Sequence, residues 1–181
     1  MKRIITPAII LLVVACLAGA CSSWREVTVR ITEQDLRERL GKKFPVTKDY
    51  KFIGTVTYAN PRITLRREDN RVELGLDIIM GDAGRSDSIR GVADMLVSVV
   101  YDQKKKAVYL ARPELQRFAV NGMPEQNIQL LSALFMPAIE KMLERNPVYR
   151  LKPKGATKKI ASMLVKDIRV REGCLEIVYG V

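Results

Sequence analysis

The chain has 181 residues, of which 48% are hydrophobic, and its 31 lysines and arginines outnumber 20 acidic residues to give a formal net charge of +11. It contains no histidine, which excludes histidine-based catalytic triads, histidine metal sites and a histidine pH switch. The basic surface suits anionic partners, and among these we favour lipid headgroups over nucleic acid.

The N-terminus has the pattern of a secretory signal. Lys2 and Arg3 precede a stretch without charge from Ile4 to Ser23, and a short apolar core followed by small residues is typical of a cleaved segment. The letters "AGAC" at 18–21 resemble the lipobox of bacterial lipoproteins, whose cysteine receives lipid and becomes the first mature residue. We therefore expect a lipoprotein signal peptide at 1–20, a lipidated Cys21 with a short tether at 21–26, and one α+β domain at 27–181.

Two other interpretations of this segment stay open. In the first, Cys16 in "VVAC" is the lipidated residue. In the second, the segment is an ordinary cleaved signal that carries no lipid. By resemblance to bacterial sorting patterns, "SS" after Cys21 places the protein on the outer membrane, facing the periplasm. Cleavage before Cys21 would remove Lys2 and Arg3, lower the net charge to +9 and leave only Cys174 as a free thiol. Cys174 is expected to be a small buried hydrophobe.

Hydrophobic periodicity predicts the remaining elements in chain order. Alternation of apolar and polar residues predicts strands, and apolar residues three or four apart predict helices. The expected strands cover 25–31, 50–58, 63–67, 71–80, 88–102 and 107–120, with a hairpin at 167–180 that turns at 172–173. The expected helices cover 33–44, with Thr32 and Asp35 as a capping box, then 125–146, and 156–165. Pro113 implies a bulge or an edge position in its strand.

This order of elements indicates an α+β domain with an antiparallel sheet. The helix at 125–146 has an unusually wide apolar stripe, so it is the natural cover for the apolar face of the sheet. We expect a long curved antiparallel sheet wrapped around this one long C-terminal helix, plus a short N-terminal helix.

Three segments carry a family resemblance: "VTVRITEQDLRERL", "LLSALFMPAIEKMLERNPVYRLKP" and "MLVKDIRVREGCLEIVYG". Together they resemble the YceB-like family of bacterial envelope lipoproteins over about residues 27 to 181. That family's fold is similar to one domain of the tubular lipid-binding proteins, relatives of the bactericidal permeability-increasing protein. The resemblance implies a curved sheet around a helix that can leave an apolar channel, and it implies no catalytic residues.

The expected function is to bind or carry a lipid or other apolar ligand in a sheet–helix tunnel, without catalysis. No phosphate loop, nucleophile elbow or cysteine metal motif is present, so we expect no enzyme, metal or cofactor. The expected ligand-lining residues are Leu74, Leu76, Ile78, Met80, Ala93, Met95, Val97, Leu131, Phe135 and Ile139. The candidate headgroup contacts are Lys104, Lys105 and Lys106; the alternative is that these lysines form a solvated hairpin turn without a partner. The alternative is a scaffold or interaction lipoprotein with a solid core and an envelope protein partner.

Overall fold

The computed structural model describes residues 26–81, 88–150 and 164–180. These ranges contain nine strands and two helices: β1 Val27–Thr32, α2 Glu33–Gly41, β2 Val46–Tyr50, β3 Gly54–Arg66, β4 Arg71–Met80, β5 Ile89–Asp102, β6 Ala107–Val120, α3 Glu125–Arg145, β7 Tyr149–Arg150, β8 Leu164–Arg171 and β9 Cys174–Gly180. The structure is thus an α+β domain of mainly antiparallel sheet with one long helix and one short helix. The predictions for the signal peptide, Cys16, Cys21 and most of the tether concern residues outside the described ranges.

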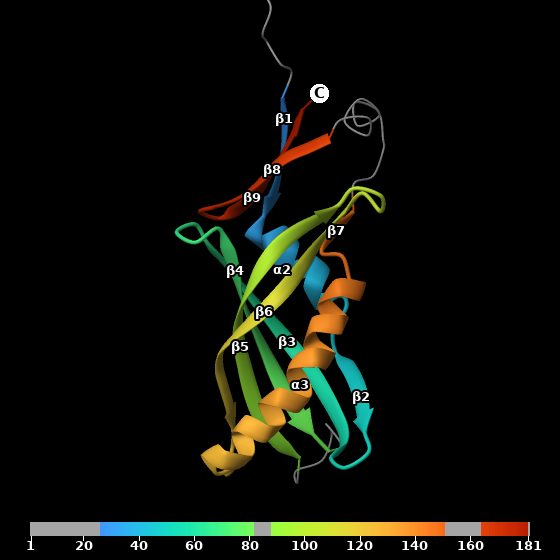
Figure 1. Cartoon of the computed structure of the whole chain (residues 1–181), viewed down its shortest axis with the longest axis vertical. Helices are drawn as coiled ribbons and strands as arrows, with labels where there is room; N and C mark the ends of the chain where they lie inside the picture. Colours follow the sequence, from blue (N-terminus) through green and yellow to red (C-terminus); the bar gives the residue numbers. More distant parts are fainter. Residues whose placement is uncertain (1–25, 82–87, 151–163, 181) are drawn as a thin grey trace, which may run out of the picture.

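The strands form two antiparallel sheets rather than the single sheet that the sequence predicted. A three-stranded sheet has the order β1-β9-β8, and a six-stranded sheet has the order β2-β3-β4-β5-β6-β7. Figure 1 shows the small sheet at one end of an elongated molecule and the large sheet running to the other end. We call the end at which β1 begins the upper end and the opposite end the lower end.

Helix α2 forms where its capping signal predicts. The Thr32 hydroxyl accepts a hydrogen bond from the Asp35 backbone N–H at 3.1 Å, and the Asp35 carboxylate accepts from the Thr32 N–H. This reciprocal pair satisfies two donors that the first turn of a helix leaves without partners. Leu36 and Leu40, four residues apart, are the buried residues of the helix, and α2 packs against β3.

The segment at 50–58 departs from the predicted single strand. A turn at 51–53 divides it, so that Tyr50 ends β2 and Gly54 begins β3. Strand β3 also continues through the gap between the strands predicted at 50–58 and 63–67. The sheet register shifts between Ala59 and Arg62, and Asn60 adopts a left-handed φ of 47°. A bulge of this kind adds a residue without ending the pairing, which explains why a turn-like sequence lies inside a strand.

Pro113 lies at a bulge, as predicted. Strand β6 pairs with β5, but the register shifts between Leu96 and Ser98, and Arg112 beside the proline has a φ of 52°. Proline has no backbone N–H to donate to a ladder, so it is tolerated where pairing is interrupted.

The C-terminal part corrects one prediction and confirms another. Leu164 and Val165 begin strand β8 and do not end a helix, while the rest of the helix predicted at 156–165 lies outside the described residues. The final hairpin is confirmed, and Gly173 at its turn has a φ of 71°. Cys174 is half-buried and not fully buried as expected.

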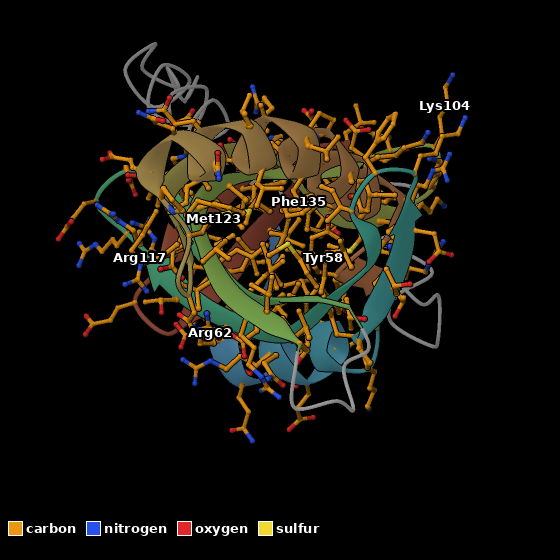
Figure 2. The ribbon with its side chains drawn as sticks, turned by 90° about the horizontal axis from the view of Figure 1, so that it is seen from below. Tyr58, Arg62, Lys104, Arg117, Met123 and Phe135 are labelled. Atoms are coloured by element: carbon orange, nitrogen blue, oxygen red, sulfur yellow. The ribbon has the colours of Figure 1, made fainter. Side chains whose placement is uncertain are left out.

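Helix α3 lies on the concave side of a curved sheet. The Phe135 ring lies 5.3 Å from the Tyr50 ring of β2 and 6.0 Å from the Phe118 ring of β6. These strands are four positions apart in the sheet order, which in a flat sheet would separate them by about 19 Å. Figure 2, seen from the lower end, shows the sheet curving round with α3 lying across its open side. No helix within the described ranges is both long and apolar enough to cross a membrane.

Candidate functional site

The candidate site is the interior between α3 and the six-stranded sheet. Most of the expected ligand-lining residues belong to one hydrophobic core there and are buried: Leu74, Leu76, Ile78, Met80, Ala93, Met95, Val97, Phe135 and Ile139. Leu131 is partly buried and packs against this core. The alternation of β4 and β5 therefore identified side chains that share one interior.

Three aromatic residues that sequence reasoning missed, Tyr50, Tyr58 and Phe118, surround the predicted Phe135 in this interior. Phe135, whose side chain is 0% exposed, meets Tyr50 and Tyr58 edge-on and Phe118 at a tilt. The Tyr50 and Tyr58 hydroxyls share a hydrogen bond of 2.7 Å. Burial, together with that hydrogen bond, raises the pKa of Tyr58 well above its usual range. Both tyrosines thus act as hydrogen-bonded parts of the core.

The interior is packed around these rings. Four hollows of about 250 to 710 Å³ are lined by described residues, and none of these four has an α3 residue in its wall. Close packing of this kind resists changes in volume. A ligand that entered here would have to displace side chains or shift α3.

The apolar surface is incompletely covered at the lower end and along α3. Phe52, in the turn between β2 and β3, is 98% exposed, and Ile89 at the start of β5 is 43% exposed. Leu130 and Leu134, one turn apart on α3, are 73% and 44% exposed. Backbone pairing brings the start of β3, the end of β4, the start of β5 and the end of β6 to this one end. Figure 1 shows the N-terminus of α3 and the turn between β2 and β3 there as well.

The expected headgroup contacts lie at the opposite end. Lys104, Lys105 and Lys106 form the turn between β5 and β6, near the upper end at which β1 begins (Figure 1). Lys105 is held by Asp102 at 3.6 Å and lies over the Tyr109 ring. The backbone N–H of Lys105 lowers the pKa of Asp102, against the opposing effect of desolvation. Lys104 points outward in Figure 2.

Asp77 and Asp94, two carboxylates on the outer face of the sheet, are paired with arginines. Arg62 reaches Asp77 at 2.5 Å and Asp94 at 3.7 Å, and Asp94 also meets Arg117 at 2.8 Å. Burial alone would raise the pKa of Asp77, but hydrogen bonds from Asn60 and Arg62 outweigh it and lower that pKa. Carboxylates held between arginines in this way are suited to an ion-pair network rather than to proton transfer.

The fold and this interior define a small α+β protein whose curved antiparallel sheet packs on a single long helix. The chain belongs to the family described as "Protein of unknown function (DUF1439)", whose model matches residues 31–174. The more specific resemblance to YceB-like lipoproteins stays a prediction.

Comparisons with individual proteins add little to the family assignment. A search of the curated proteins finds no match. Among solved structures, the chain is similar to a crystal structure of lipopolysaccharide binding protein, with 12% sequence identity and a TM-score of 0.31. The similarity covers 87% of this chain and 50% of that one, so the chain spans about half the length of that protein. A likeness at this level does not establish a shared function.

Proposed function

We propose that this protein is a lipid-anchored envelope protein that binds a lipid or another apolar ligand between α3 and the curved sheet. The observation that carries the proposal is the incompletely covered apolar surface at the lower end and on α3. Exposed apolar groups that cluster on a folded protein mark sites of interaction. Here Phe52 and Ile89 are exposed at the lower end, and Leu130 and Leu134 are exposed on the N-terminal half of α3.

Helix α3 is suited to contact apolar ligands. The stretch from Gln126 to Ile139 contains no charged residue, although several of its side chains face outward. An ordinary amphipathic helix presents charged residues on its outer side. The lack of charge over most of α3 leaves a surface that water solvates poorly and that an acyl chain can cover.

The seam between α3 and β2 is the proposed route of entry. Strand β2 has five residues and pairs with β3 alone among the described strands, so its other edge carries unpaired backbone groups. Helix α3 packs along β6, whereas the Tyr50 and Phe135 rings bridge it to β2. Separating α3 from β2 therefore breaks side-chain contacts but no backbone hydrogen bonds between strands. The flexible thioethers of Met95 and Met136 would adapt to ligands of different shape.

Residue-specific photo-crosslinking tests the ligand directly. Leu131, half-buried on α3, is replaced by p-benzoylphenylalanine in the full-length chain, and cells are irradiated before the protein is analysed by mass spectrometry. We expect a lipid-sized mass on the protein labelled at Leu131 and none when the exposed Lys141 carries the same group. Equal labelling at both positions, or labelling at neither, would count against a ligand at this seam.

The anchor is proposed at Cys21. Two or more acyl chains hold a protein stably on a membrane, whereas one chain alone does not. Attachment through the residues before β1 would set the turn of Lys104, Lys105 and Lys106 near the anionic headgroups. The lower end of the molecule would then face away from the membrane. The variant Cys21→Ser should leave the membrane fraction or retain an uncleaved signal, while Cys16→Ser should behave as wild type. The reverse result would assign the lipid to Cys16.

The packed interior favours a second candidate function. Nine of the ten expected lining residues lie buried in one core around Phe135, which is what a scaffold with a solid core requires. In that case the exposed apolar residues would bind an envelope protein partner. Photo-crosslinking at Leu131 separates the two candidates, because a scaffold gives a discrete protein adduct and no lipid mass.

A further inference from the structure

One of the four hollows lies between the C-terminal end of α2 and strand β7. It has a volume of about 560 Å³, and its wall includes Arg39, Lys42, Lys43, Arg150 and Tyr149. The Lys43 ammonium donates a hydrogen bond to the Pro147 carbonyl, which ties α2 to the segment after α3. Figure 1 shows the end of α2 close to the top of α3. We call this hollow the basic groove.

Positive charge in the basic groove is not balanced by carboxylates. Among the described residues, no carboxylate lies within ion-pair distance of Arg39, Lys42, Lys43 or Arg150. Asp35 also lines the groove, but its carboxylate accepts hydrogen bonds from Thr32.

Glu38 is the other acid of the groove, and it accepts a hydrogen bond from Gln34. Four cations and two anions thus leave the wall with an excess of two positive charges. The arginines on the outer sheet face differ, because Arg62, Arg71 and Arg117 each have a carboxylate partner.

The cations of the groove repel one another and are partly held in place. Burial, and then the positive charge of Arg150, lower the pKa of Lys43 below its ordinary value. The Arg39 guanidinium lies 5.0 Å from the centre of the Tyr149 ring, and stacking of this kind orients its donors. Cations arranged in this way are stabilised when an anion binds between them.

We propose that the basic groove binds a phosphate-bearing anion, either a free phosphate ester or the headgroup of a phospholipid. A phosphate monoester carries between one and a half and two negative charges near neutral pH, which matches the excess charge of the wall. Guanidinium groups such as those of Arg39 and Arg150 pair with phosphate oxygens through two parallel hydrogen bonds. The volume is in the range of sites for small molecules, so it accommodates more than a bare ion. This inference does not depend on an apolar ligand at α3.

Calorimetric titration of the full-length protein in dodecyl maltoside with glycerol 3-phosphate tests the proposal. We expect saturable binding of one equivalent, weakened about tenfold or more by the double variant Lys42→Gln/Arg150→Gln. The double variant Lys48→Gln/Lys51→Gln removes the same charge near the turn between β2 and β3 and should bind as wild type. Arg39→Lys should retain more affinity than Arg39→Gln, because it keeps the charge. All variants are compared at matched thermal stability.

Two results would overturn the proposal. One is the absence of saturable binding below about 10 mM; the other is an equal loss of affinity in the groove variant and in the control. Dioctanoyl phosphatidic acid in the same detergent then distinguishes the sources of the phosphate. Binding at least about tenfold tighter than that of glycerol 3-phosphate assigns a phospholipid headgroup, and equal affinity assigns a free ester.

Discussion

Replacing Phe135 by alanine removes the side chain around which the interior is organised. The ring is 0% exposed and contacts three other rings, which belong to β2, β3 and β6. Truncation of a buried phenylalanine costs about 3–5 kcal/mol, since apolar burial is lost and a cavity remains. The three ring contacts add to the usual loss, so we expect Phe135→Ala to lower the free energy of unfolding by about 4 kcal/mol.

Urea unfolding followed by far-UV circular dichroism measures this loss. Leu130→Ala is the matched control, because Leu130 lies on the same helix but is 73% exposed. Its effect should stay within about 0.5 kcal/mol. A loss below about 1.5 kcal/mol for Phe135→Ala would mean that α3 is not packed into the curved sheet as described, and the position of the candidate site would be wrong.

Three further predictions concern the sheet, the short helix and the outer charges, and each is measured by unfolding. Gly91→Ala should destabilise the protein by about 1–3 kcal/mol, because a Cβ would lie 2.6 Å from the Ala119 carbonyl oxygen; Gly41→Ala, with open space around it, should not. Thr32→Ala should cost about 1 kcal/mol through loss of the cap. Because the pKa of Asp77 is lowered on folding, the Asp77 carboxylate stabilises the folded state above about pH 4, and this stabilisation is lost as the pH falls further. Asp77→Asn should therefore flatten the dependence of stability on pH below about pH 4.

Each of these three predictions has a result that contradicts it. Equal stabilities of Gly91→Ala and Gly41→Ala would refute the close approach of β5 and β6. An unchanged unfolding midpoint for Thr32→Ala would show that the cap contributes nothing. An acid transition that is identical in Asp77→Asn and wild type would refute the ion pairing of Asp77.

Much of the sheet was predictable because strands such as β4 bury every second residue. The apolar residues Val72, Leu74, Leu76, Ile78 and Met80 occupy alternate positions in the sequence and are buried in the structure. The start of α2 was predictable as well, because its capping box is made by residues only three positions apart in the sequence. These features depend on neighbours along the chain.

The missed features depend on contacts between distant segments. The turn at 51–53 has no glycine or proline of its own, and its exposed Phe52 continues the alternation of a strand. The division into two sheets follows from β1 pairing with β9, whose residues are about 150 positions away. Alternation along one strand does not specify its partner.

The candidate site was predictable in part for the same reason. Periodicity identified the inward faces of β4, β5 and α3, but Tyr50 and Phe118 meet Phe135 only because the sheet curves. The basic groove had no signal in the sequence, since Arg39, Lys43 and Arg150 come together only through the contact of α2 with the segment after α3.

Native mass spectrometry of the full-length protein, released gently from bacterial membranes, tests the central claim most directly. If α3 and the curved sheet enclose an apolar ligand, the spectrum should contain a species heavier by one lipid in addition to any covalent anchor. Phe135→Ala should change the occupancy of that species, and Lys48→Gln should not. A spectrum that contains only the unliganded mass, and that stays unchanged after incubation with phospholipid or fatty acid, would contradict the claim and favour the scaffold.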